Sequence, residues 1–427
     1  MTNPHDVISV LESKLLVDRN AIVVDLERSL SSWVIDHRTG KQYLDCFSQF
    51  ASQALGWNHP KMVSQKDRLA AVAINRPANS DMYTTHMADF VSKFSEFTPD
   101  FRHHFYICGG AIAVENGLKA AFDWKAKKRG LKDEAACNRL QVIHLKDAFH
   151  GRSGYTMSMT NNDNQRNPKI YGFPKFPWKK IHNPKVWHDL NGPDEIKARN
   201  SEVIAVNEAR NILKEGNVAA IIMEPIQGEG GDNHFRKEFL SEMRQLADDY
   251  EAMLVFDEVQ TGLGLTGKNW AYEHFGVKPD ILCFGKKVQV CGILAGDRID
   301  EVEDNVFREA SRINSTWGGN IVDMVRSTMQ MEIIQEENLV ENAAHVGHYF
   351  LQRLKEFRER ATNIRGRGLM LAFDLENKER RDKFVADLEK EGMLALPCGT
   401  KSVRLRPHLT FSKSDVDEAI KFMEKVI

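Results

Sequence analysis

The sequence predicts an α/β protein with a large domain, built on a mainly parallel sheet covered by helices, and a smaller α/β lobe at the C-terminus. Apolar runs such as Val218–Met223 and Met253–Phe256 are continuous, as in strands that are buried on both faces of a parallel sheet. Segments with helical spacing separate these runs, which is the order typical of α/β domains. We therefore expect three parts, at residues 1–59, 60–320 and 321–427.

The N-terminal part contains two stretches that are expected to form short strands. The first is "AIVVDLERS" at residues 21–29. The second covers residues 31–48, in which His37–Gly40 has the composition of a turn between two strands. We expect this segment to pack beside the C-terminal lobe.

The large domain alternates strands with helices. Residues 105–110 form an apolar run that ends in glycines, and residues 111–130 have helical spacing with Gly130 near the end. The later elements follow the same order. They are a strand and loop at 140–151, a buried strand at 218–231 that breaks at Pro225, an amphipathic helix at 236–252, and strands that end in loops at 253–264 and 280–287.

The pattern changes after residue 320. Residues 322–361 have the composition and spacing of long helices. Strands are expected at 368–375, 393–399 and 402–411, accompanied by two helices, the last of which begins at the N-cap sequence "SKSD" at residues 412–415. These elements predict the smaller lobe.

Composition excludes several classes of protein. The 427 residues contain 58 Lys and Arg against 60 Asp and Glu, so the net charge offers no attraction for nucleic acid or an acidic membrane surface. The six cysteines include no CxxC pair, which favours reduced thiols over disulfides or a zinc site. The N-terminus has no secretory pattern, and no window approaches the ~20 apolar residues of a membrane span. We therefore expect a cytoplasmic protein.

Small and aromatic residues follow two of the predicted strands, where an open α/β sheet binds its ligands. Gly110 and Ala111 open a helix, whose N-terminus can bind phosphate, although glycines before helices are common. Phe149 could stack on a flat heterocycle and Arg152 could bind a carboxylate. Alternatively, this loop is solvated and its phenylalanine packs inward.

Charged residues follow three further strands. Asp257 could form a structural ion pair, or it could keep a pyridine nitrogen protonated. Glu224 and Glu229 lie near the same edge, and no histidine spacing supports a metal site there. The adjacent Lys286 and Lys287 could be surface charges, or one could be a desolvated nucleophile. Together, a phosphate site, a stacking ring, a partner for a pyridinium and an amine describe pyridoxal 5'-phosphate bound as a lysine Schiff base.

Five motifs then resemble those of class III (ω-) aminotransferases, which are pyridoxal phosphate enzymes of fold type I. They are "FDEVQTGLGLTG", "KPDILCFGKK", "EPIQGEGG", "DAFHGRSG" and "NSTWGGN". Within the family, "CGGAIAVENGLKAAFDWK", "GKKVQVCG" and "SVRLRPHLT" are most similar to the lysine ε-aminotransferase branch. The chain departs from the ornithine and acetylornithine branches in its Gly-Gly-Ala phosphate loop, and in Leu265, where many members carry arginine.

The resemblance implies roles at the matching positions. It makes Lys286 the Schiff-base lysine, with Lys287 as the alternative, and pairs Asp257 with the pyridine nitrogen. Gln260 would contact the phenolic oxygen, and Phe149 would stack on the ring with His150 beside it. Gly110 and Ala111 would bind the phosphate. Ser315 and Thr316, with Asn314 nearby, would reach the phosphate of the neighbouring subunit's cofactor. Because the site is shared in this way, a homodimer is implied.

The same resemblance implies an activity. The terminal amine of L-lysine would pass to 2-oxoglutarate, giving L-glutamate and 2-aminoadipate 6-semialdehyde, which cyclises to piperideine-6-carboxylate. Arg152 would bind the distal carboxylate of both substrates and Arg406 the adjacent carboxylate of 2-oxoglutarate. With lysine bound, an unpaired buried guanidinium is costly, so we expect Glu229 to pair with Arg406. The alternatives are an ω-aminotransferase for ornithine or 4-aminobutyrate, an aminomutase, and a non-catalytic scaffold.

Overall fold

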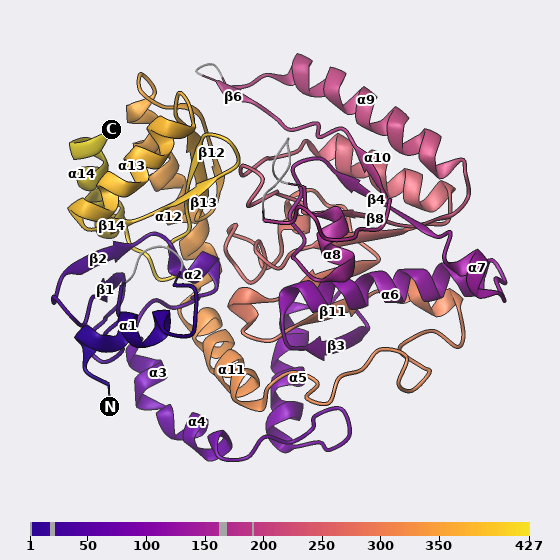
Figure 1. The fold of residues 1–427 in the computed structure, drawn as a ribbon, viewed down its shortest axis with the longest axis horizontal. Helices are drawn as coiled ribbons and strands as arrows, with labels where there is room; N and C mark the ends of the chain where they lie inside the picture. The colour runs from indigo at the N-terminus through magenta and orange to yellow at the C-terminus, as the bar shows by residue number, and fades with distance from the viewer. Residues whose placement is uncertain (1, 18–21, 162–168, 190–191) are drawn as a thin grey trace.

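The computed structural model describes residues 2–17, 22–161, 169–189 and 192–427. Figure 1 shows the large sheet with its helices on one side of the molecule, and the N-terminal strands beside the C-terminal lobe on the other. Both chain ends lie on the side of the smaller lobe. No helix of the described ranges is long and apolar enough to cross a membrane.

A seven-stranded sheet forms the centre of the large domain, in the order β3-β11-β10-β9-β8-β4-β5. Only β11 runs antiparallel to its neighbours, which confirms the mainly parallel sheet. The strands are β3 (His103–Ile107), β4 (Gln141–Leu145), β5 (Lys179–Ile181), β8 (Val218–Met223), β9 (Met253–Asp257), β10 (Ile281–Phe284) and β11 (Cys291–Ala295).

Helices cover both faces of this sheet because its strands are apolar on both sides. Val255 and Ile281 pack with Val114 of α6 (Gly110–Lys128) on one face. The alternate strand residues, such as Phe256, pack on the other face in the core that includes α10 (Lys237–Asp249). This two-sided burial is the reason that the strand sequences read as unbroken apolar runs.

The smaller lobe contains two further sheets. The order β12-β13-β16-β15 forms an antiparallel sheet, while β2 pairs with both β1 and β14. β2, in the N-terminal segment, thus lies beside β14, which follows α13 near the C-terminus. The strands are β1 (Trp33–Ile35), β2 (Gln42–Asp45), β12 (Thr362–Arg367), β13 (Met370–Asp374), β14 (Met393–Leu394), β15 (Leu396–Cys398) and β16 (Ser402–Leu405).

The remaining elements are helices and short pieces around the sheets. The hairpin β6 (His188–Asp189) and β7 (Gly192–Pro193) lies outside them. The other α-helices are α1 (Val7–Glu12), α2 (Ser48–Ala51), α3 (Pro60–Ser64), α4 (Lys66–Ala73), α5 (Thr85–Phe97), α7 (Glu134–Cys137), α8 (Gly154–Met159), α9 (Glu195–Leu213), α11 (Ile321–Glu336), α12 (Leu339–Leu354), α13 (Lys378–Glu391) and α14 (Lys413–Val426). Single 3₁₀ turns are η1 (Pro4–Asp6), η2 (Ala271–His274), η3 (Lys286–Val288), η4 (Asp297–Glu301) and η5 (Lys355–Phe357).

One predicted strand is wrong. The described part of residues 21–29 forms a turn and a single bridge between Val24 and Asp36. The reason is local, because Oδ1 of Asp25 accepts hydrogen bonds from the amides of Glu27 and Arg28 and bends the chain. The expected N-cap of the last helix is confirmed, since Ser412 and Asp415 form a capping box. The division into 1–59, 60–320 and 321–427 stays a prediction.

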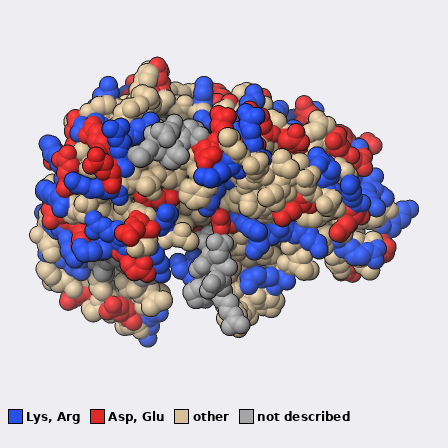
Figure 2. All heavy atoms as spheres, turned by 90° about the horizontal axis from the view of Figure 1, so that it is seen from above, with Lys and Arg blue, Asp and Glu red and all other residues tan. Residues whose placement is uncertain are grey.

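Charged side chains of both signs are intermingled on the face shown in Figure 2. This agrees with the nearly balanced composition of 58 basic and 60 acidic residues. No extended surface of one sign, of the kind that binds nucleic acid, is visible on that face.

Candidate active site at the carboxyl edge of the central sheet

Lys286 lies where β10 ends. Gly285 follows the strand, and a Cβ there would lie 2.9 Å from Sγ of Cys291, so a residue with a side chain would not fit without a shift. Lys286 itself has a left-handed backbone, with φ of 49°. Burial lowers the pKa of its amine to about 8, and the nearby Arg404 acts in the same direction, while Asp257 opposes it. Such an amine is neutral, and therefore nucleophilic, at a lower pH than an ordinary lysine.

Lys287 has a different environment. Its side chain is 1 % exposed, and Nζ donates a 2.7 Å hydrogen bond to the carbonyl oxygen of Ala51 in α2. Burial, the charge of Lys286 and that of Arg406 hold its pKa well below the usual range. Because its amine already has a backbone partner, the geometry favours Lys286 over Lys287 as the reacting lysine.

Asp257 ends β9, the strand next to β10. Its Oδ2 lies 2.8 Å from Nδ1 of His150, and its Oδ1 accepts from the amide of Val259 at 3.1 Å. Burial acts to lower the pKa of His150, but the hydrogen bond and charge of Asp257, together with Glu224, hold it above the ordinary value. The pair is thus a buried carboxylate held in place by an imidazole.

Glu224 follows β8 and lies close to this pair. It accepts hydrogen bonds from the amides of Phe149 at 3.0 Å and of Gly228 at 2.9 Å. Burial raises its pKa to about 7, an effect that His150 opposes and Asp257 reinforces. Glu224 therefore fixes the backbone of Phe149 relative to the strand ends.

The loop after β4 packs on the N-terminus of α6. A Cβ at Gly151, where φ is 120°, would lie 2.5 Å from the Cβ of Ala111, so only glycine fits this contact. Likewise, a Cβ at Gly110 would lie 3.0 Å from Cγ1 of Val259. These contacts bring the predicted phosphate site beside the strand ends that position Phe149 and Asp257.

Arg152 is exposed, and its guanidinium carbon lies 5.8 Å from the ring centroid of Phe149. Phe149 is half-buried, and its stacking on a cofactor stays a prediction. Its ring remains available for stacking at the sheet edge.

The expected pairing of Glu229 with Arg406 is wrong. The guanidinium of Arg404 donates to Oε2 of Glu229 at 2.5 Å. Residues two apart on a strand point to the same side, so spacing alone could not distinguish the two arginines of "SVRLRP". Arg404 is thus a site residue that the sequence interpretation missed.

Arg406 is only 1 % exposed and has other partners. It forms an ion pair with buried Asp232 and donates to Oε1 of Gln260 at 3.3 and 3.2 Å from Nε and Nη2. It also donates to the carbonyl oxygens of Leu371 and Leu405 at 3.2 and 2.9 Å. Its position therefore suits holding Gln260 rather than receiving a substrate carboxylate.

Asn314, Ser315 and Thr316 lie in the segment before α11. Asn314 and Thr316 are exposed, and Oγ of Ser80 donates to the carbonyl oxygen of Thr316 at 3.2 Å. No hydrogen bond or ion pair found in the described ranges joins these three to Lys286 or Asp257. Their expected contact with a second subunit's cofactor stays a prediction.

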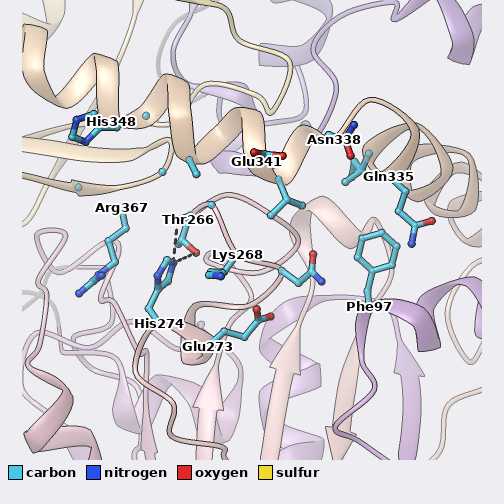
Figure 3. Close-up of a pocket in the computed structure, with 18 of the residues that line it drawn as sticks. Phe97, Thr266, Lys268, Glu273, His274, Gln335, Asn338, Glu341, His348 and Arg367 are labelled. Atoms are coloured by element: carbon cyan, nitrogen blue, oxygen red, sulfur yellow. Dashed lines mark hydrogen bonds between the residues drawn. The ribbon is translucent and has the colours of Figure 1, made fainter.

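A cleft of about 850 Å³ lies elsewhere, between η2, α5, α11, α12 and the turn after β12. Figure 3 shows Thr266, His274 and Arg367 at one end of it, with Nε2 of His274 near Thr266 at 3.0 and 3.1 Å. None of the predicted site residues lines this cleft. The candidate site is therefore defined by the converging strand ends and not by this cavity.

Comparison with known proteins decides the family. Residues 16–427 match the family described as Aminotransferase class-III. The chain is a class III aminotransferase. Lys286, Asp257 and His150 can therefore be interpreted as residues of a class III aminotransferase.

Curated relatives of this aminotransferase share much of its sequence. It is 46 % identical over 429 residues to the L-lysine-epsilon aminotransferase of Amycolatopsis lactamdurans, covering 98 % of this chain and 94 % of that one. It is 32 % identical to the 4-aminobutyrate aminotransferase of Kluyveromyces lactis, covering 95 % and 90 %. Among solved structures, lysine aminotransferase from M. tuberculosis superposes with a TM-score of 0.94 at 46 % identity, covering 100 % and 99 % of the two chains.

Pyridoxal 5'-phosphate is the cofactor of this aminotransferase, as its family and the M. tuberculosis structure indicate. The residues present fit it. Lys286 offers an amine of lowered pKa, Asp257 a buried carboxylate, and Gly110 with Ala111 a helix N-terminus. No group of His, Cys, Asp and Glu suited to a metal ion occurs in the described part of the chain.

Proposed function

We propose that this class III aminotransferase transfers the terminal amino group of L-lysine to 2-oxoglutarate, giving 2-aminoadipate 6-semialdehyde and L-glutamate. One observation carries the choice of amine. The chain shares 46 % identity with L-lysine-epsilon aminotransferases over nearly its whole length, against 32 % with a 4-aminobutyrate aminotransferase. The semialdehyde then cyclises to piperideine-6-carboxylate, because its amine and aldehyde lie in one molecule.

Several residues at the sheet edge have separate roles in this reaction. When bound, the cofactor supplies an electron sink for the carbon that loses its proton. Nζ of Lys286 removes the proton from the ε-carbon of lysine and later delivers one, and a pKa of about 8 suits both steps. Asp257 would maintain the positive charge of the ring nitrogen, and His150 holds Asp257 in position. Phe149 would cover the ring of the cofactor, and Gln260, held by Arg406, would bind its phenolic oxygen.

The site must accept two unlike substrates in turn. Arg152 binds the distal carboxylate of each one. Arg404, in place of Arg406, binds the second carboxylate of 2-oxoglutarate, because Arg404 has an acidic partner that can move. That partner, Glu229, has a side chain that is 30 % exposed, whereas Arg404 is 4 % exposed. With lysine bound, Glu229 stays on Arg404, since a buried guanidinium without a partner is costly.

The proposal is tested by mixing the purified holoenzyme with one amine at a time. L-Lysine should convert the cofactor to its amino form in a single turnover, followed by absorbance. Ornithine and 4-aminobutyrate should react at least about tenfold more slowly, as the loss of well-placed binding contacts predicts. Faster conversion by either amine would assign the enzyme to that substrate. Conversion without any transfer to 2-oxoglutarate would instead indicate an aminomutase.

Changing the ion pair should affect the two half-reactions unequally. In the Arg404→Met variant, the 2-oxoglutarate half-reaction should slow by about 100-fold, the effect of losing a buried charged contact, while the lysine half slows less. Glu229→Gln should mainly impair the lysine half-reaction, because Arg404 then lacks its charged partner. Single-turnover rates for each substrate measure both effects. Equal losses in the two halves would contradict this assignment.

Two further features belong to the same proposal. A homodimer would cover the exposed Asn314 and Thr316, bringing them and Ser315 to the cofactor phosphate of the partner subunit. A cytoplasmic location suits the six cysteines, all of which have free thiols in the structure. Sedimentation of the holoenzyme would measure the assembly.

A further inference from the structure

Four successive residues of the N-terminal segment have left-handed backbones. In α2, Ser48, Gln49, Phe50 and Ala51 have φ values of 44°, 54°, 59° and 68°. None of them is glycine, so each one raises the free energy of this conformation. Such a turn persists only where surrounding contacts impose it, and it marks a place where geometry matters more than local stability.

The chain before the turn is fixed within its own segment. Oδ1 of buried Asp45 accepts from the amides of Phe47 at 3.0 Å and Ser48 at 2.7 Å. Its Oδ2 accepts from Nε1 of Trp57 at 3.0 Å. In addition, the amide of Arg406 donates to the carbonyl oxygen of Cys46 at 2.7 Å. One end of the turn is therefore attached to the strand end that carries the site arginines.

The other end is attached to η3, which carries Lys286. Nζ of Lys287 donates to the carbonyl oxygen of Ala51 at 2.7 Å, and Nε2 of Gln289 donates to that of Ser52 at 2.9 Å. Gln289 also donates to the carbonyl oxygen of Lys286, from its backbone at 2.7 Å and from Nε2 at 3.2 Å. The side chain of Lys287 thus contacts the last residue of the left-handed turn, and that of Gln289 joins Ser52, directly after the turn, to the backbone of Lys286.

A lysine at this buried position is expected to lower the stability of the folded state relative to an apolar side chain. The amine of Lys287 has the charges of Lys286 and Arg406 nearby, and no acidic partner is found for it in the ion pairs of the described chain. An apolar side chain of the same length would avoid the cost of desolvation. Its presence is explained if the hydrogen bond to Ala51 serves the geometry of the site.

We propose that Lys287 is a positioning residue, which holds the turn Ser48–Ala51 against η3 and so fixes the direction of the Lys286 side chain. Lys286 has a strained backbone with φ of 49°, so it too depends on contacts from outside η3. The inference rests on the proposed role of Lys286 as the reacting amine. It assigns a function to the second lysine of the pair, whose amine is bonded to the backbone of Ala51.

The test replaces Lys287 with methionine, which keeps the length of the side chain and removes the donor. In cofactor-free protein, hydrogen exchange of the peptide at residues 46–53 should become about tenfold faster, as expected for the loss of one hydrogen bond that holds a strained turn. In the holoenzyme, the single-turnover rate with L-lysine should fall by about tenfold or more, with little change in the lysine concentration needed for half-maximal rate.

Lys125→Met is the matched control. Lys125 is 2 % exposed and donates at 3.1 and 2.6 Å to the carbonyl oxygens of Tyr250 and Glu251, which precede β9 at the opposite end of that strand from Asp257. It should lose comparable thermal stability, yet keep wild-type exchange at 46–53 and the wild-type rate. If both lysine variants show the same changes, or if Lys287→Met shows none, the positioning role is wrong.

If Lys287→Met does not fold, Gln289→Ala is the second variant that tests the positioning role. It removes the neighbouring 2.9 Å contact to Ser52 from a half-buried position, and should speed exchange of the same peptide by a few-fold. Unchanged exchange in this variant would overturn the inference. The exchange measurement does not depend on activity. A wild-type enzyme that fails to react with lysine would therefore refute the proposed function, while the exchange rates would still decide whether Lys287 holds the turn.

Discussion

Lys286→Ala is expected to abolish transamination. In the proposed mechanism this amine forms the covalent bond to the cofactor and moves the proton, and alanine can do neither. Both half-reactions should slow by about 10⁴-fold or more, the combined effect of losing a nucleophile and a general base. Stopped-flow absorbance after adding L-lysine, or 2-oxoglutarate to the amino form, would measure the two rates.

The same residue should show its lowered pKa directly. In cofactor-free wild-type protein, modification of Lys286 by an amine-selective reagent should have a midpoint near pH 8, because only the neutral amine reacts. Below that pH the amine is protonated and the reaction slows. Peptide mapping after borohydride reduction of the holoenzyme should then place the cofactor on Lys286 and not on Lys287.

A surface lysine provides the control for this experiment. Lys278 precedes β10 and has a side chain that is 47 % exposed, at 3.9 Å from Asp100. Lys278→Ala should keep the wild-type rate and cofactor spectrum. If the borohydride-reduced cofactor were found on Lys287, the assignment of the reacting lysine would be refuted.

Asp257→Asn is expected to have the second largest effect. In the proposed mechanism the carboxylate maintains a positive charge on the ring nitrogen, and the neutral side chain of asparagine would not. Rates of both half-reactions should fall by on the order of 10³-fold, the size of effect seen when a preorganised electrostatic contact is removed. The cofactor should remain bound, because Lys286 and the helix N-terminus are unchanged.

The variant should also lower the pKa of His150. Asp257 holds that pKa above its ordinary value, so in Asp257→Asn burial should make the imidazole neutral at a lower pH. Titration of the labelled histidine by NMR measures this shift. If the rates fell while the titration of His150 did not change, the 2.8 Å contact between the two side chains would not exist in solution.

Asp280→Asn is the matched control. Asp280 is also a buried aspartate beside the central sheet, where Oδ2 accepts from the amide of Leu254 at 2.7 Å. It forms ion pairs with Arg244 at 2.9 Å and Arg298 at 3.0 Å. The variant should lose thermal stability and keep the rate of the chemical steps. An equal loss of rate in both variants would contradict a specific role for Asp257.

Much of the large domain could be predicted because its signals are local. Unbroken apolar runs identified β8, β9 and β10, and the residues after each one marked the edge where Glu224, Asp257 and Lys286 meet. Helical spacing likewise identified α6 and α10. Parallel strands place their carboxyl ends together, so a few strand ends suffice to predict the location of a site.

The long helices expected within residues 322–361 are confirmed as α11 and α12, which are separated at Asn338, whose φ is 53°. One prediction failed where a local pattern allowed two outcomes. Residues 393–399 read as one strand, but β14 pairs with β2 and β15 pairs with β16. The partner of β14 lies far away in the sequence, in the N-terminal segment, so the local pattern could not show the break.

The sequence by itself determined the fold class, the family and the group of residues at the sheet edge, because periodicity and motifs are properties of neighbouring residues. Only the tertiary structure decided which charged groups meet. In it, Glu229 forms an ion pair with Arg404, and Arg406 contacts Asp232 and Gln260. Lys287 donates a hydrogen bond to Ala51, 236 residues away in the sequence. Ion pairs and hydrogen bonds depend on distances of a few ångströms, and those distances are set by how separate segments pack.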